Sequence, residues 1–238
     1  MKTLVMIRAN RKDQSIVKQN MGWYLKSGCD LAGVDGRDSM LDCWPIDFKY
    51  AIAFGPEEFP LFNESGRNSG VPAFLIEMFD WFIVNTDYDS FIATEADSMF
   101  VGKVPDKVPN GFGAFIAGYC PPQWNCGDGP FLHPPFWMSR ETVIEFVRVG
   151  RKMVKEGDTG NGSPDVFAGL VCRRAGIPIE QQNVYSTNGN DMRCASKLIE
   201  ARTAYNTGAW HIHGVKRQDH IDWITSATNA WSKDVIME

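Results

Sequence analysis

The sequence lacks the short motifs that mark several large classes of protein. Its six cysteines include no Cys-x-x-Cys pair, and no histidine pattern accompanies them at zinc-finger spacing, which argues against a structural zinc site. Gly111 and Gly113 are not followed by a third glycine at Gly-x-Gly-x-x-Gly spacing, so the dinucleotide-binding fingerprint is absent. A Walker loop and a Gly-x-Ser-x-Gly nucleophile elbow are missing as well.

Long hydrophobic runs are also missing. No stretch approaches the length of a membrane span, and the apolar run from Leu4 to Ile7 is too short for the core of a signal peptide. We therefore expect a cytoplasmic protein with no transmembrane segment, in which the cysteines are free thiols; the alternative is a small loop closed by Cys120 and Cys126. Cys29 and Cys172 stand among apolar residues and are expected to be buried.

The composition is typical of a globular chain with a charged surface. Hydrophobic residues make up 44% and charged residues 22% of the 238 residues, which is enough for a substantial core. The length fits one large α/β domain or two small ones. The net charge of −5 argues against general nucleic-acid binding, although it leaves room for a local basic patch.

The order of the hydrophobic patterns predicts an α/β fold. Residues 4–7 have the pattern of a buried strand, residues 15–26 that of a helix, and residues 29–34 that of a second strand. This order is typical of a parallel βαβ unit. We expect a single domain over residues 1–238, with a mostly parallel central sheet and helices on both faces. The other expected elements are strands at 50–54, 90–94, 112–117, 136–138 and 209–212, helices at 72–84, 140–155, 164–176 and 219–231, and a long loop over 118–135.

Two carboxylates directly follow the strand expected at 90–94. Glu95 and Asp97 stand two residues apart, at a position where open α/β sheets bind ligands. Paired oxygen donors suit a divalent cation that also contacts phosphate groups. An EF-hand calcium loop is excluded, because the sixth position counted from Asp87 is Ile92 rather than glycine. The alternative is a pair of solvated turn residues, since acidic residues are common at strand ends.

Three further residues occupy positions suited to a ligand. Arg8 follows the first strand and is placed to pair with a diphosphate, or else to lie in a solvated loop. Asp35 follows the second strand and is a candidate for binding a ribose or a base, or else an ordinary Asp-Gly turn residue. Asp165 follows a glycine-rich segment in the first turn of a helix, whose dipole is expected to favour the ionised form that a general base requires. Helix-end electrostatics alone is the alternative for Asp165.

Two histidines near the carboxyl terminus complete the set of candidates. His211 and His213 are two apart on an expected strand, so their side chains point to the same side. Imidazole is a common ligand for manganese-like and zinc-like ions. Gly214 permits the close approach of a ligand, and Lys216 adds a phosphate-binding cation. The alternative is a pair of partly buried structural histidines.

In their order along the chain, these motifs resemble those of a GT-A fold glycosyltransferase, in the nucleotide-diphospho-sugar transferase superfamily. Ser163-Pro164-Asp165-Val166 resembles the acidic motif that holds the base in inverting members. The sequence departs from the family pattern by having Glu at the first acidic position, and residues 34–39 only echo the Asp-Asp-Gly-Ser pattern of the commonest branch. The resemblance rests on Arg8, on Asp35, on the Asp-x-Asp-like Glu95-Ala96-Asp97 and on His213-Gly214-Val215-Lys216.

The resemblance implies a single GT-A-like domain, with a nucleotide-sugar half over about 1–102 and an acceptor half over about 103–238. It implies a hexosyl- or pentosyltransferase that uses Mn²⁺ or Mg²⁺ and a nucleotide-sugar donor, with a UDP-sugar as the first candidate. Asp165 corresponds to the catalytic base, and Asp97 and His213 correspond to the metal ligands. The residues implied to bind the donor are Arg8, Asp35, Glu95, Asp97 and Lys216.

Other functions and several acceptors stay open. A nucleotidyltransferase would need a glycine-rich loop after the first strand, and residues 8–13 contain no glycine. A non-enzymatic carbohydrate-binding module would use the eight tryptophans as its binding surface. For a glycosyltransferase, the acceptor is a glycan, a lipid-linked glycan, a protein or a modified nucleobase. A phage-type enzyme acting on modified DNA bases would use a basic rim made of Arg193, Lys197, Arg202, Lys216 and Arg217. The negative net charge of the chain argues against such an enzyme.

Overall fold

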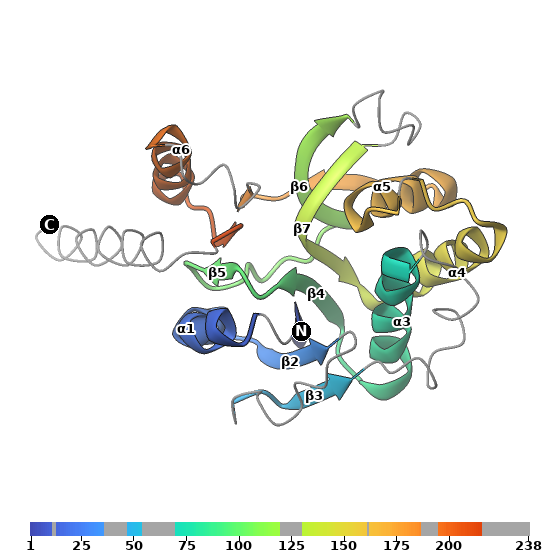
Figure 1. Cartoon of the computed structure of the whole chain (residues 1–238), viewed down its shortest axis with the longest axis horizontal. Coiled ribbons are helices and arrows are strands. Elements are labelled where there is room, and N and C mark those ends of the chain that lie inside the picture. Colours follow the sequence, from blue (N-terminus) through green and yellow to red (C-terminus); the bar gives the residue numbers. More distant parts are fainter. Residues whose placement is uncertain are drawn as a thin grey trace, which may run out of the picture.

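The computed structural model describes residues 1–10, 13–35, 47–53, 70–119, 130–160, 162–186 and 195–215. Its central feature is a seven-stranded sheet in the order β3-β2-β1-β4-β7-β6-β8 (Figure 1). These strands are β1 (Thr3–Ala9), β2 (Asp30–Asp35), β3 (Tyr50–Ala53), β4 (Ser90–Glu95), β6 (Phe112–Tyr119), β7 (Pro130–Ser139) and β8 (Ile179–Gln181). A second sheet has the order β5-β10-β9 and consists of β5 (Ser98–Phe100), β9 (Tyr185–Ser186) and β10 (His211–His213). The described helices are α1 (Gln14–Leu25), α3 (Gly70–Asn85), α4 (Arg140–Glu156), α5 (Pro164–Ala175) and α6 (Ala195–Asn206).

The central sheet is mixed but mostly parallel. Strands β3, β2, β1 and β4 run in the same direction. β6 and β8 are parallel to each other, and β7 runs antiparallel to both of its neighbours, β4 and β6. The first strands and helix form the parallel βαβ unit that the sequence predicts. The expected α/β class with a mostly parallel sheet is therefore confirmed.

Alternate residues of the central strands pack on opposite faces of the sheet, as the period of a strand requires. In β1, Leu4 and Met6 belong to the core formed with α3, α4 and α5, whereas Val5 and Ile7 belong to the core formed with α1. Figure 1 shows α3, α4 and α5 on one side of the sheet, and α1 and β5 on the other. Helices therefore cover both faces.

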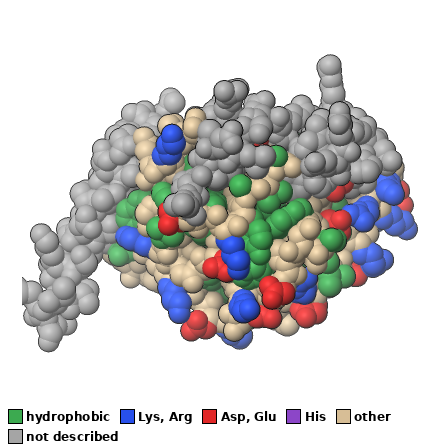
Figure 2. Space-filling model, turned by 90° about the horizontal axis from the view of Figure 1, so that it is seen from below, with side chains coloured by type: hydrophobic (Ala, Val, Ile, Leu, Met, Phe, Trp, Pro, Cys, Tyr) green, Lys and Arg blue, Asp and Glu red, His purple; other side chains and the backbone are tan. Residues whose placement is uncertain are grey.

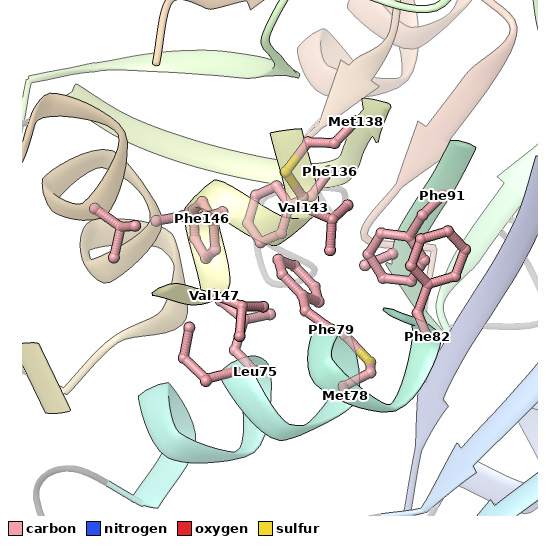
Figure 3. Close-up of a cluster of buried hydrophobic side chains, with 14 of the residues drawn as sticks. Leu75, Met78, Phe79, Phe82, Phe91, Phe136, Met138, Val143, Phe146 and Val147 are labelled. Carbon is pink, nitrogen blue, oxygen red and sulfur yellow. The ribbon is translucent and has the colours of Figure 1, made fainter. Parts of the chain in front are cut away.

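The larger of these cores lies between the sheet and helices α3 and α4 (Figure 3). The ring centroid of Phe79 lies 4.8 Å from that of Phe91 and 5.3 Å from that of Phe146. Tilted and edge-to-face contacts of this kind stabilise aromatic pairs. A Cβ atom at Gly150 of α4 would lie 2.3 Å from Cδ1 of Ile76, so this glycine allows α3 and α4 to approach closely.

Helix α4 begins and ends at residues suited to those positions. Oγ of Ser139 accepts a hydrogen bond of 3.2 Å from the backbone N–H of Thr142. Gly157 ends the helix in the left-handed conformation at φ 74°, which glycine adopts at little cost. The observed helix therefore agrees with the helix expected at 140–155.

Several elements differ from those expected. The long loop expected over 118–135 is wrong at both ends, because β6 extends to Tyr119 and β7 begins at Pro130. Pairing between these two strands stabilises an extended backbone that residue type alone does not indicate. Strands β5, β8 and β9 and helix α6 are additional elements. The helix expected at 219–231 lies outside the described residues.

The surface carries charges of both signs close together. Figure 2 shows basic and acidic side chains interspersed on one face of the molecule. The ion pairs of the protein include that of Arg151 with Asp80, at 2.8 Å. Within the part of the chain that the structure describes, no helix combines the length and the hydrophobicity needed to cross a membrane.

Candidate metal-binding site

The carboxyl ends of β1 and β4 lie side by side and place Arg8 next to Glu95. The register of these parallel strands pairs the two residues directly. Paired residues point to the same face of a sheet, and Nη2 of Arg8 donates a hydrogen bond to Oε1 of Glu95. Their side chains are 27% and 30% exposed, so a ligand can reach this ion pair from solvent.

The turn after β4 brings Asp97 next to His213. The backbone oxygen of Asp97 accepts hydrogen bonds from the N–H groups of Gly214, at 3.1 Å, and Val215, at 2.8 Å. Together with the antiparallel pairing of β5 and β10, these bonds hold the turn against the end of β10. As a result, Nε2 of His213 lies 3.3 Å from Oδ1 of Asp97 and 3.4 Å from Oε2 of Glu95.

Glu95, Asp97 and His213 form a group suited to a divalent cation. One ligand atom from each residue lies within 4.8 Å of the other two. Carboxylate oxygens suit Mn²⁺ and Mg²⁺, but the imidazole makes the set a better fit for Mn²⁺, because Mg²⁺ prefers oxygen ligands. The geometry also selects His213, rather than His211, as the histidine of this group. His211 is fully buried, and its Nε2 lies 3.1 Å from Oγ1 of Thr94.

Asp165 lies close to this group, in the first turn of α5. It lines a cavity of about 20 Å³ with Arg8, Glu95 and Phe136, which has room for one water molecule. Burial raises the pKa of Asp165 to about 6, while the charges of His213 and Arg8 act in the opposite direction. Burial therefore acts against the ionised form that the helix dipole is expected to favour. With this pKa, the carboxyl group is still mostly ionised at neutral pH.

Acidic side chains surround Arg8. Burial lowers the pKa of its guanidinium, and the negative charges of Asp165, Asp97 and Asp13 oppose that shift. An arginine remains protonated at any pH at which a protein is folded. Among the described residues, Arg8 is therefore a permanent cation among several carboxylates. Its planar guanidinium suits phosphate oxygens.

The structure describes only one of the two other expected contacts of the donor. Asp35 ends β2 and is fully buried. Its register partner is Ala9, which directly follows Arg8, so the side chain of Asp35 points to the opposite face of the same sheet edge. Lys216 lies outside the described residues. The structure thus brings together five of the predicted residues, namely Arg8, Glu95, Asp97, Asp165 and His213.

Two further residues next to His213 carry no recognisable sequence signal. Ser186 of β9 is the register partner of His213, and its Oγ lies 2.9 Å from Nδ1 of that histidine. The same oxygen lies 3.1 Å from Nδ1 of His133 in β7. Burial, assisted by the charge of His213, lowers the pKa of His133 to about 4. A single serine in a short strand and an isolated histidine match no motif, so only the fold reveals their proximity.

Comparison with known proteins does not assign the chain to a family. No protein-family model matches the chain, and no curated protein matches its sequence. The function is therefore inferred from the arrangement of the side chains and from the order of the motifs.

Proposed function

We propose that this protein is a metal-dependent glycosyltransferase of the GT-A type, which moves a sugar from a nucleotide-diphosphate sugar to an acceptor hydroxyl. The observation that carries the proposal is the convergence of Glu95, Asp97 and His213 at the end of β4, within 4.8 Å of one another. Open α/β sheets bind ligands at this edge. Arg8 and Asp165 add a cation for phosphate and a carboxylate for proton transfer.

The diphosphate of the donor is proposed to bind at Arg8 and the adjacent metal ligands. Asp97 and His213 hold Mn²⁺ in this proposal, and Glu95 either joins them or contacts the ribose. When bound, Mn²⁺ stabilises the negative charge of the departing diphosphate. The guanidinium of Arg8 matches two phosphate oxygens, and its ion pair with Glu95 keeps it at the edge of the site.

The nucleoside is proposed to bind further along the same edge of the sheet. Asp35 is the proposed contact for the ribose or base, although its fully buried side chain on the opposite face from Arg8 would first have to become exposed. Lys216 is a second proposed cation for the diphosphate. A UDP-sugar is the first donor to test. The cavity of about 20 Å³ beside Asp165 has room for a water molecule but not for a sugar, so donor and acceptor approach from the open side of the edge.

Asp165 is the proposed general base, which takes the proton from the acceptor hydroxyl. With a pKa of about 6, its carboxylate is mostly ionised at neutral pH and is more basic than an ordinary aspartate. A base that deprotonates the acceptor hydroxyl would allow it to attack opposite the leaving diphosphate, and such an attack would invert the anomeric configuration.

Thermal unfolding in the presence of nucleotides tests the proposal. Nucleoside diphosphates and nucleotide-sugars would each be added with Mn²⁺ or with EDTA. A ligand that binds the native state at 100 times its Kd stabilises by about 2.7 kcal/mol and raises Tm. We expect a Mn²⁺-dependent rise with one nucleoside diphosphate, followed by transfer of the matching sugar to a hydroxyl acceptor.

Two aspartate variants control for changes unrelated to the site. Asp97→Asn should lose the Mn²⁺-dependent rise in Tm, because a carboxylate ligand is removed. Asp106→Asn should keep it, because the Asp106 side chain is 95% exposed and pairs with Lys103 rather than with the site. If the Tm of the folded protein responded to no nucleotide, with or without Mn²⁺, this result would contradict the proposed glycosyltransferase activity and favour a carbohydrate-binding module.

A further inference from the structure

A short chain of hydrogen bonds extends from the candidate metal site into the protein. Nδ1 of His213 lies 2.9 Å from Oγ of Ser186, and that oxygen lies 3.1 Å from Nδ1 of His133. The other ring nitrogen of His213 is the atom that faces Asp97, at 3.3 Å. One edge of the imidazole is thus directed at the metal site and the other at Ser186.

Three strands fix the positions of these side chains. Ser186 and His213 are register partners in the parallel pair of β9 and β10, so they point to the same face. His133 reaches the same place from β7 of the central sheet, where it pairs with Phe115 of β6. Ser186 is only 6% exposed, and the His213 side chain is 12% exposed, which limits exchange of these hydrogen bonds with water.

Metal binding at Nε2 of His213 determines the direction of the hydrogen bonds. A ligating Nε2 carries no proton, so Nδ1 of the neutral ring must carry one and donates it to Oγ of Ser186. The hydroxyl of Ser186 is then available to donate to Nδ1 of His133. His133 must be neutral to accept this bond at Nδ1.

We propose that Ser186 and His133 are positioning residues for the metal site, which hold the ring of His213 with Nε2 directed at Asp97 and Glu95. This inference rests on the proposed function, because it assigns His213 as a metal ligand. Ser186 acts directly on the ligand, and His133 acts through Ser186. Partners of this kind fix the ring orientation and tautomer of a ligating histidine, and their loss weakens metal affinity about 10- to 100-fold.

The first test measures Mn²⁺ affinity, from the electron paramagnetic resonance signal of free Mn²⁺ titrated with protein. Ser186→Ala should weaken binding about 10- to 100-fold, whereas Ser186→Thr keeps the hydroxyl and should remain close to wild type. His133→Leu removes the acceptor of one neutral hydrogen bond and should weaken binding about two- to tenfold. His133→Asn places an amide oxygen near the former Nδ1 position and should restore most of the affinity.

A matched control separates this effect from a general loss of packing. Ser90 is a fully buried serine at the start of β4, where its Oγ lies 2.6 Å from Oγ1 of Thr3. Ser90→Ala removes the same atom from the opposite end of the sheet, so Mn²⁺ affinity should stay at the wild-type value. Circular dichroism of each variant establishes that the measured protein is folded.

The outcomes distinguish this inference from the function on which it rests. No Mn²⁺ binding by folded wild-type protein would overturn both. Binding that Asp97→Asn abolishes but Ser186→Ala leaves unchanged would overturn the positioning role alone. Equal losses in Ser186→Ala and Ser186→Thr would also overturn it, because the hydroxyl would then be irrelevant.

A spectroscopic test follows the protons directly. In protein loaded with Zn²⁺, a diamagnetic probe, the ¹⁵N chemical shifts of the imidazole rings report which nitrogen carries a proton. We expect His213 to be protonated at Nδ1, and His133 to be protonated at Nε2 with Nδ1 as an acceptor. A His133 ring protonated at Nδ1 would contradict the proposed direction of the hydrogen bonds.

Discussion

The aromatic core between α3, α4 and the sheet contrasts with the polar cluster at the end of β4. In the core, Phe79, Phe91 and Phe146 are fully buried, and the ring of Phe79 contacts those of the other two. In the cluster, Nε2 of His213 lies within 3.4 Å of oxygens of two carboxylates. The core removes apolar surface from water, whereas the cluster concentrates ionisable groups that water would otherwise solvate.

This difference suggests that one region governs the stability of the fold and the other governs ligand binding. Burial of apolar surface stabilises a fold by roughly 25 cal/mol for each Å² removed from water. Partly buried charges lose hydration, which their mutual attraction only partly offsets. We therefore expect the core to determine the free energy of unfolding, and the cluster to determine ligand affinity and turnover. A substitution that changed both properties equally would weaken this division.

The largest expected effect is on turnover, at Asp165. Asp165→Asn preserves the shape of the side chain but removes the group that accepts a proton, so kcat should fall by about 10²- to 10⁴-fold. Mn²⁺ affinity should change little, since Asp165 is not one of the three proposed ligands. Steady-state sugar transfer and a Mn²⁺ titration measure the two quantities. Wild-type turnover in Asp165→Asn would remove this residue from the mechanism.

The next largest effect is on stability, at Phe79. Phe79→Ala leaves a cavity against Phe91 and Phe146, and should lower the free energy of unfolding by about 3–5 kcal/mol. Urea unfolding followed by circular dichroism measures this loss. Mn²⁺ affinity of the folded protein should remain within about twofold of wild type, because Phe79 itself does not line the cavity that Arg8, Glu95 and Asp165 share. A parallel loss of affinity would show that the two regions are coupled.

A smaller effect concerns the pH dependence of stability. The folded protein binds the Asp165 proton with a pKa of about 6, above the ordinary value of 3.8, so folding favours the protonated form. The resulting stabilisation is fully present below about pH 4 and is lost as the pH rises through about 6. Relative to Asp165→Asn, wild-type protein should lose on the order of 1–3 kcal/mol between these limits. Urea titrations in EDTA at several pH values test this, and a constant difference between the two proteins would contradict it.

The smallest effect is expected at the start of α4. Ser139→Ala removes the acceptor for the N–H group of Thr142 and should lower the free energy of unfolding by about 0.5–2 kcal/mol. Ser139→Asp, which also caps a helix, should restore much of the loss. Urea unfolding of the two variants measures the difference. No change in Ser139→Ala would indicate that packing, rather than capping, fixes this end of the helix.

Much of the candidate site could be predicted because its residues stand next to clear structural boundaries. Arg8 and Glu95 directly follow or end apolar runs, and Asp97 is two residues further along. Asp165 follows a helix-start pattern that the structure also has, with Ser163 at the N-cap position and Pro164 at the first position of the helix. Such signals are local, so they can be recognised in the sequence without knowledge of the fold.

The second sheet could not be predicted in the same way. β9 has two residues and β5 and β10 have three each, too few for a periodic pattern to emerge. Their pairing joins segments that are far apart in the chain, and it is this pairing that places Ser186 beside His213. His133 belongs to no sequence motif, and its position in β7 places it beside Ser186.

The sequence by itself determined the first βαβ unit and the placement of two carboxylates at the end of β4, because hydrophobic period and covalent spacing act over a few residues. Only the tertiary structure decided which charged groups meet. It turned Asp35 to the opposite face from Arg8, it set His213 against Asp97, and it raised the pKa of Asp165 to about 6. These outcomes depend on strand register and on burial, both of which arise from contacts between residues distant in the chain.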